Sequence, residues 1–193
     1  MRIISGIYRG RRLQPPVNLP VRPTTDFAKE GLFNVLNNTI DFESIKVLDL
    51  FAGTGSIAFE FLSRGAIDVT AIDSNHRCVE FIKKTAETFG ATNMQAVKSN
   101  SFVFIKHMVS TYDLIFADPP YDLERIEAIP DLIFSSVLLA EDGLLILEHS
   151  ASYKFEKHPC FDSHRQYGSV NFSFFRRKKG AEVQPGRSSE QIS

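Results

Sequence analysis

The sequence predicts an α/β domain built on a parallel sheet. Between residues 45 and 150, short apolar runs typical of buried strands alternate with amphipathic stretches typical of helices. Glycines close two of the helical stretches, at Gly65 and Gly90, where a helix commonly ends. Helices of this length between strands form βαβ crossovers and cover both faces of a parallel sheet. With 193 residues, of which 43% are hydrophobic and 17 are phenylalanine, the chain can form one domain with a sizeable core.

The segment before this repeat contains three expected elements. Residues 2–13 alternate weakly and carry a turn signal at Arg9-Gly10, which predicts a short β-hairpin. Residues 14–23, QPPVNLPVRP, form a proline-rich connector. Residues 24–38 begin with Thr and Asp capping candidates and continue with apolar residues at helical spacing. A helix of about 13 residues is therefore expected there.

The repeat predicts strands at residues 45–51, 68–74, 94–100, 112–120 and 143–150. Helices are expected at residues 55–65, 76–90, 101–109 and 123–137. Residues 164–179 then predict an antiparallel hairpin that turns at Gly168-Ser169. After it the chain has almost nothing to bury, which is typical of a disordered tail. We therefore expect a basic hairpin and connector over 1–22, the main domain over 23–179 and a tail over 180–193.

The net charge of −1 conceals a strong segregation along the chain. Residues 1–25 hold five arginines and no acid, residues 26–156 have a balance of −10, and residues 157–193 have a balance of +4. An acidic body with two basic ends favours an anionic partner, such as nucleic acid, at those ends. Lysine and arginine also protect exposed strand edges, and that role would give the same pattern.

Several classes of protein are disfavoured by composition. Cys78 and Cys160 lack ligand-like spacing and the five histidines are scattered, so we expect reduced cysteines and no metal site. No apolar run approaches the roughly 18 residues needed to span a bilayer. The N-terminus also lacks the apolar core of a signal peptide. A soluble, cytoplasmic protein without membrane contact is expected.

The first candidate site is the stretch VLDLFAGTGSIAFEFL, which predicts a strand, a glycine turn and a helix. Ligands of parallel α/β sheets bind outside the carboxyl ends of the strands, and Gly53 and Gly55 would allow the backbone a close approach. Asp49, at the strand end, would repel a pyrophosphate but suits an ammonium or a sulfonium. Asp73 ends the next strand and could accept hydrogen bonds from a ribose diol. A purely structural glycine turn with a capping aspartate is the alternative. Together the residues favour an adenosine-containing cofactor, with S-adenosylmethionine preferred over NAD because of Asp49.

The second candidate site is ADPPY, at residues 117–121. The exocyclic amine of guanine or adenine is a poor nucleophile because its lone pair is delocalised into the ring. Two fixed acceptors, the Asp118 carboxylate and the Pro119 carbonyl, could hold the two N–H groups and turn the lone pair toward a methyl donor. Pro119 and Pro120 would keep these oxygens rigid, and Tyr121 could stack on a base removed from its helix. A simple strand-ending turn could contain the same residues.

The chain resembles the bacterial 16S ribosomal RNA guanine-N2 methyltransferases, the RsmD family, from residue 1 to about residue 178. The motifs that carry this resemblance are MRIISGIYRGRRL, RPTTDFAKEGLFNVL, DLFAGTGSIAFEFLSRGA, AIDS, KSNSF and ADPPY. DPPY alone also occurs in DNA adenine methyltransferases. Its combination with the arginine-rich opening and RPTTD is more specific to the RsmD family.

The resemblance implies a Rossmann-like, seven-stranded methyltransferase fold with a small N-terminal β-hairpin extension. It also implies methylation of N2 of one guanine in 16S rRNA by S-adenosylmethionine, within the assembled small ribosomal subunit, and we expect a monomer. Carried over by motif, the target-base site is Asp118, Pro119, Pro120 and Tyr121. The cofactor site is Asp49, Phe51, Gly53, Gly55, Asp73, Ser74, Asn100 and Ser101. Arg22, Thr24 and Thr25 would lie near the cofactor or the base entry, and RNA phosphates would be contacted by Arg2, Arg9, Arg11, Arg12 and Arg22.

Two other functions stay open at this point. A DNA adenine-N6 methyltransferase is disfavoured because no segment is long enough for a separate sequence-reading domain. A non-catalytic RNA-binding or ribosome-assembly module is disfavoured because it would not need both Asp118 and Tyr121 beside a cofactor turn.

Overall fold

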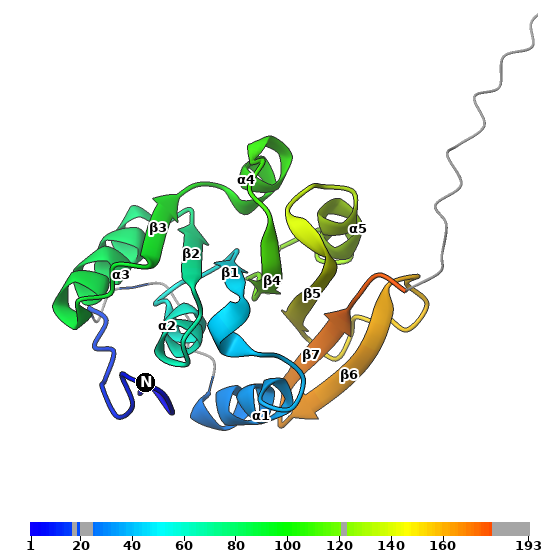
Figure 1. Cartoon of the computed structure of the whole chain (residues 1–193). Coiled ribbons are helices and arrows are strands. Elements are labelled where there is room, and N and C mark those ends of the chain that lie inside the picture. The colour runs from blue at the N-terminus through cyan, green and yellow to red at the C-terminus, as the bar shows by residue number, and fades with distance from the viewer. Residues whose placement is uncertain (17–18, 20–24, 121–122, 179–193) are drawn as a thin grey trace, which may run out of the picture.

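A seven-stranded sheet with the order β3-β2-β1-β4-β5-β7-β6 forms the centre of the computed structural model (Figure 1). The structure describes residues 1–16, 19, 25–120 and 123–178. Strands β1 to β5 are parallel, and β7 runs antiparallel to both β5 and β6. The strands are β1 Lys46–Asp49, β2 Asp68–Asp73, β3 Met94–Lys98, β4 Tyr112–Ala117, β5 Leu139–His149, β6 Phe161–Tyr167 and β7 Val170–Phe175. The α/β fold class predicted from the sequence is confirmed.

Helices cover both faces of the sheet, because successive strand residues point to opposite sides. Val47 of β1 belongs to a core with residues of α1, α2 and α3, whereas Leu48 belongs to a core with residues of α4 and α5. The helices are α1 Asp26–Leu36, α2 Ser56–Ser63, α3 His76–Phe89, α4 Ser101–His107 and α5 Ala128–Phe134, with a 3-10 turn at Phe42–Ser44. Within the described residues, no helix is both long and apolar enough to cross a bilayer.

The element boundaries differ from the prediction where proline and tertiary pairing intervene. Helix α5 begins at Ala128 rather than at residue 123, so that Pro130 lies in its first turn, where a missing N–H breaks no helical hydrogen bond. Strand β5 begins at Leu139, which pairs with Tyr112, rather than at residue 143. The predicted C-terminal hairpin is present as β6 and β7, and Gly168 adopts a φ of 62° at its turn.

The direction of the connections reverses between β1 and β4. From β1 the chain runs outward to β2 and β3, and it then returns to β4 on the other side of β1. The helices that follow β1 and β4 therefore lie on opposite faces, which opens a crevice at the carboxyl ends of these two strands. This crevice is where ligands of such sheets bind.

The N-terminal segment is an antiparallel turn that lies on α2. Arg2 and Arg12 form one isolated bridge, and the chain reverses over residues 5–10, a wider turn than the expected one at Arg9-Gly10. The Ile7 amide donates to the Ser63 carbonyl at 2.8 Å. Gly6 lies so close to α2 that a Cβ there would overlap the Ser63 carbonyl.

A buried ion pair fastens this segment to two helices. Lys29 of α1 and Glu60 of α2 are both fully buried, with 3.5 Å between Nζ and Oε2. The Glu60 carboxylate also accepts hydrogen bonds from the backbone amides of Ile4 and Ser5, at 2.9 and 3.1 Å. Lys29 Nζ donates to the Arg2 carbonyl at 2.7 Å, and burial lowers the pKa of this ammonium. The segment is thus held by bonds to its backbone. These bonds do not restrict which exposed side chains it carries.

Candidate functional site

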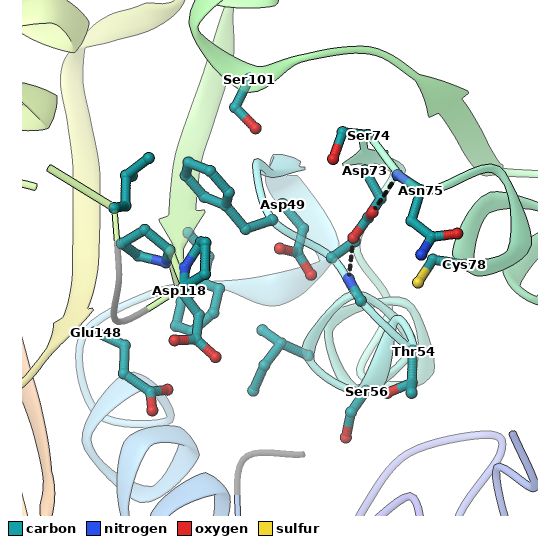
Figure 2. A pocket seen from close by; sticks show the side chains of 18 of the residues that line it. Asp49, Thr54, Ser56, Asp73, Ser74, Asn75, Cys78, Ser101, Asp118 and Glu148 are labelled. Carbon is teal, nitrogen blue, oxygen red and sulfur yellow. Dashed lines mark hydrogen bonds between the residues drawn. The ribbon is translucent and has the colours of Figure 1, made fainter. Parts of the chain in front are cut away.

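The carboxyl ends of β1, β2, β4 and β5 border a pocket of about 560 Å³ (Figure 2). Its volume is typical of a small-molecule binding site. Four carboxylates line it, and among the described lining residues there is no lysine, arginine or histidine. These carboxylates are Asp49, Asp73, Asp118 and Glu148. The pocket therefore suits a ligand that is cationic or rich in hydrogen-bond donors, and it disfavours a phosphate.

Asp73, at the end of β2, connects the glycine turn to the start of α3. Its Oδ2 accepts a hydrogen bond from the Gly53 amide at 2.8 Å, and its Oδ1 accepts one from the Asn75 amide at 2.7 Å (Figure 2). Burial raises the pKa of the carboxyl, and the two amides act in the opposite direction. Since each carboxylate oxygen has two lone pairs, Asp73 can still accept hydrogen bonds from a ligand.

Gly55 forms the step from the glycine turn into α2. It occupies the N-cap of this helix with a φ of 73°, in the left-handed region that favours glycine. A Cβ would also lie 3.0 Å from Ile82 and 3.2 Å from Phe59, tighter than ordinary contacts. The turn that faces the pocket therefore requires glycine at this position.

Asp49, the last residue of β1, is a buried carboxyl with unused hydrogen-bonding capacity. The residue is 1% exposed, and within the described part of the chain its Oδ1 has no hydrogen-bond partner. Burial, together with the nearby charge of Asp118, raises the pKa of Asp49 to about 8, while the Phe51 and Ala58 amides act in the opposite direction. A cationic ligand group in the pocket would favour the ionised form. Asp49 thus fits the sulfonium or ammonium of the cofactor expected from the sequence.

Gly55 itself does not line the pocket, whereas the remaining predicted cofactor residues do: Phe51, Ser74, Asn100 and Ser101. Two of them have structural bonds that the sequence did not reveal. Asn100 caps α4 by accepting hydrogen bonds from the Phe102 and Val103 amides at 3.0 and 3.2 Å. The Ser101 hydroxyl donates to the Leu50 carbonyl. Ser101 thus holds the start of α4 against the end of β1, and the Asn100 amide group keeps its N–H donors for a ligand.

The DPPY motif lies on the opposite side of the pocket. Asp118 directly follows β4 and is half-buried, while Pro119 is buried and Pro120 is exposed. All three line the pocket, and the Pro120 carbonyl accepts a hydrogen bond from the Leu123 amide at 3.0 Å. Tyr121 lies outside the described residues. Asp118 and Asp49 are close enough for their charges to interact, so the two predicted sites share one pocket.

Glu148 is the most informative residue missed by the sequence analysis. It lies near the end of β5, it is 5% exposed, and its carboxylate faces the pocket beside that of Asp118 (Figure 2). The signal was present, because an acid interrupts the apolar run GLLIL at a strand end, as Asp49 and Asp118 do.

Other lining residues were missed because they are ordinary residue types or are distant in the sequence. Cys78 of α3 is buried, and burial raises the pKa of its thiol to about 11, so it stays neutral. Ser169 and Val170 reach the pocket from the hairpin of β6 and β7. Thr25 was not missed: it was expected near the cofactor or the base entry, and it lines the pocket and caps α1 by accepting a hydrogen bond from the Ala28 amide at 3.2 Å. The others are Ala52, Thr54, Ser56, Ile57, Asn75, Phe102, Phe116 and Leu123.

The predicted RNA-contacting arginines differ in their surroundings. Arg2 forms ion pairs with Asp26 at 3.9 Å and Glu30 at 3.6 Å. The guanidinium of Arg11 lies over the rings of Phe89 and Tyr8, 4.7 and 5.4 Å from their centroids. Arg9 and Arg12 are exposed, and Arg22 and Thr24 lie outside the described residues. None of the four described arginines lines the acidic pocket. No cluster of three or more His, Cys, Asp or Glu suited to a metal ion occurs in the part of the chain that the structure describes.

Comparisons with known proteins agree with this geometry. Residues 1–176 match the family described as conserved hypothetical protein 95. Ribosomal RNA small subunit methyltransferase D of Escherichia coli K12 is 31% identical over 185 residues, which cover 94% of this chain and 92% of the relative. The structure of the putative methyltransferase YhhF from E. coli superposes with a TM-score of 0.79 at 30% identity, covering 92% of this chain and 98% of that one.

A more distant structure shares the fold. It is the 16S rRNA N2 G1207 methyltransferase of Thermus thermophilus in complex with AdoMet and guanosine, with a TM-score of 0.64 at 21% identity. The match covers 80% of this chain and 44% of that one. The fold is therefore the Rossmann-like fold of S-adenosylmethionine-dependent methyltransferases. The chain belongs to the family described as conserved hypothetical protein 95, the RsmD family that its sequence motifs resemble.

Proposed function

We propose that this protein transfers a methyl group from S-adenosylmethionine to the N2 amine of one guanine in 16S ribosomal RNA. The observation that carries the proposal is the shared pocket, in which Asp118 and Pro119 lie opposite the glycine turn and Asp73. The name of the E. coli relative, a ribosomal RNA small subunit methyltransferase, supports RNA of the small subunit as the substrate.

The residues around the glycine turn would hold the cofactor. When bound, S-adenosylmethionine supplies a methyl group on a positively charged sulfur. Asp49 would ionise and balance the positive charge of the ligand, and Asp73 would accept hydrogen bonds from the ribose hydroxyls while it keeps the Gly53 and Asn75 amides in place. Asn100 and Ser101 would border the adenine, together with the rings of Phe51 and Phe102.

Asp118 and Pro119 would position the amine of the target base. The Asp118 carboxylate and the Pro119 carbonyl would each accept one N–H of N2, so that its lone pair faces the methyl carbon. N2 loses one proton as its new bond to carbon forms, and Asp118 would accept that proton or pass it to water. A strong general base is unnecessary because the amine becomes acidic only during the transfer. Tyr121, the next residue of the motif, would stack on the extruded base.

The basic N-terminal segment would contact RNA phosphates beside the entrance of the base. Arg9 and Arg12 are exposed on a segment whose backbone is fixed to α2, which reduces the ordering cost of binding. We further propose that the substrate is the assembled small ribosomal subunit, that the enzyme acts as a monomer in the cytoplasm, and that residues 1–22 form the RNA-contacting part ahead of the catalytic domain.

The experiment that tests the proposal is methyl transfer followed by mass-spectrometric mapping. Small subunits from a strain that lacks the modification are incubated with the full-length protein and labelled S-adenosylmethionine, and the methylated nucleotide is identified. The proposal expects one N2-methylguanine in 16S rRNA. Label in the adenines of duplex DNA would instead support an adenine-N6 methyltransferase. RNA binding without affinity for S-adenosylmethionine would support a non-catalytic module.

A further inference from the structure

We infer that Glu148 is a specificity-determining residue that accepts a hydrogen bond from N1–H of the target guanine and so rejects adenine. The inference rests on the proposed function, because the proposed function defines where the target amine lies. Glu148 belongs neither to the DPPY motif nor to the glycine-turn motif.

The sheet register brings Glu148 next to Asp118. Strands β4 and β5 are parallel, and Ala117 pairs with Leu147, so the residues that follow each of them are neighbours at the strand ends. Adjacent strands lie about 4.8 Å apart, close to the width of a purine edge. The two carboxylates point into the same part of the pocket (Figure 2). A base whose amine is held by Asp118 would therefore present the neighbouring ring atom to Glu148.

The environment of Glu148 is unusual for a residue that only stabilises the fold. It is 5% exposed and directly follows four buried apolar residues, Leu144–Leu147, while Phe172 of β7 is its partner across the strand pair. A carboxylate costs free energy when it is withdrawn from water, and such groups concentrate in functional pockets. Together with Asp118 it makes the base-binding side of the pocket a surface of acceptors.

Guanine and adenine differ at the atom beside the reactive amine. In guanine, the N2 amine is next to N1–H, so the edge presents a row of donors to the two carboxylates. In adenine, the N6 amine is next to N1 with a lone pair, which would face the Glu148 carboxylate and repel it. A site whose polar groups hydrogen-bond to the edge of one base discriminates strongly against a base that leaves those polar groups without partners. Glu148 would thus provide the guanine preference that Asp118 and Pro119, which hold only an amine, do not.

The first test uses the wild-type protein and a substrate with a single altered base. 2-Aminopurine keeps the N2 amine but has a lone pair at N1, and it is placed in reconstituted small subunits at the nucleotide found by the mapping experiment. We expect kcat/KM for methyl transfer to fall roughly 100-fold relative to guanine. Transfer to 2-aminopurine within about threefold of guanine would overturn the inference. If guanine itself receives no methyl at N2, the proposed function fails first, and the inference with it.

The second test gives the side chain a donor. In Glu148→Gln the carboxamide can donate an N–H to N1 of 2-aminopurine, so transfer to this base should rise at least tenfold above the wild type. The carboxamide oxygen can still accept N1–H of guanine but carries no charge, so transfer to guanine should fall by only about threefold to tenfold. Since both enzymes encounter the same 2-aminopurine without O6, its gain in rate isolates the contact at N1. A variant that loses both activities in parallel would overturn the inference.

Two controls separate recognition from folding. Glu141→Gln changes an exposed acid on the same strand, and it should leave both rates unchanged. The affinity of Glu148→Gln for S-adenosylmethionine, measured by calorimetry, should stay within about twofold of the wild type, because Glu148 lies on the base side of the pocket. If this affinity is lost, the wild-type comparison of guanine with 2-aminopurine decides the inference alone.

Discussion

The carboxylate of Asp73 accepts a hydrogen bond from the backbone amide of Gly53 at 2.8 Å and thereby ties the end of β2 to the turn after β1. The second oxygen binds the Asn75 amide at 2.7 Å. The residue expected to hold a ribose is thus also the residue that fixes the loop around the ligand. Both roles require a carboxylate, because each of its two oxygens accepts hydrogen bonds and neither donates one.

We expect Asp73→Asn to weaken both the fold and the cofactor site. An asparagine would direct its NH₂ group at one of the two amides, which would leave a partly buried N–H without an acceptor at a cost of about 1–3 kcal/mol. Thermal unfolding without ligand should report a lower midpoint, and calorimetry should report at least tenfold weaker binding of S-adenosylmethionine. Asp162→Asn, at an exposed acid of β6, is the matched control. An unchanged midpoint would show that the two backbone hydrogen bonds contribute little.

Asp49→Asn should stabilise the ligand-free protein, most strongly at alkaline pH. The pKa of Asp49 is raised from 3.8 to about 8, so the folded state favours the neutral carboxyl. The stability contribution of Asp49 is therefore complete below about pH 4 and is lost as the pH rises toward about 8. Asparagine does not titrate, so the gain in free energy of unfolding of the variant should be larger near pH 8.5 than near pH 5, by about 2 kcal/mol or more.

Denaturant unfolding at these two pH values measures the gain, and cofactor affinity provides the second half of the prediction. Asparagine cannot carry the negative charge that would balance a sulfonium or an ammonium, so binding should weaken by an order of magnitude or more. A gain that is equal at both pH values would argue against titration of Asp49. Stabilisation with unchanged affinity would remove Asp49 from the cofactor site.

Asp118→Ala should separate binding from chemistry. Asp118 would act on the amine of the base, so methyl transfer into small subunits should fall at least 100-fold while the affinity for S-adenosylmethionine changes little. Because the charge of Asp118 raises the pKa of Asp49, its removal should favour ionised Asp49 and strengthen cofactor binding slightly, which the same titration measures. Full transfer activity in the variant would contradict the assignment. Asp162→Ala serves as the control for an exposed acid.

The arginines of the N-terminal segment should contribute unequally to RNA binding. Arg9→Ala should weaken binding to small-subunit RNA and reduce the slope of log affinity against log salt by about one, without a change in cofactor affinity. Arg2→Ala should have a smaller effect because Asp26 and Glu30 already pair with this guanidinium. Filter binding over a series of salt concentrations distinguishes the two variants. Equal slopes for Arg9→Ala and the wild type would exclude Arg9 as a phosphate contact.

Residues of the site could be predicted from the sequence where a short local pattern marks them. Asp49, Asp73 and Asp118 each follow an apolar strand run, and parallel strands end at one edge of a sheet, so their convergence follows from the pattern. Glu148 obeys the same rule within GLLILEH. By contrast, Ser169 and Val170 reach the pocket only because β7 inserts beside β5, and no periodicity of the chain indicates that pairing.

The second roles of site residues were also outside the reach of sequence patterns. The hydrogen bond from Gly53 to Asp73 joins the turn after β1 to the end of β2, and the Ser101 hydroxyl donates to the Leu50 carbonyl. The N-terminal turn was expected from its glycines, but its attachment depends on Lys29 and Glu60, which look like ordinary helix-surface charges in the sequence. Both residues are buried only through tertiary packing, which the sequence does not indicate.

Arg64 of α2 also pairs with Glu60, at 3.0 Å, so the buried Glu60 carboxylate keeps a cationic partner when Lys29 is replaced. The two positions of the Lys29–Glu60 pair are therefore not equivalent. Loss of Glu60 would leave the buried Lys29 ammonium without its carboxylate partner and the amides of Ile4 and Ser5 without their acceptor. In an alignment of relatives, position 60 should accordingly vary less than position 29.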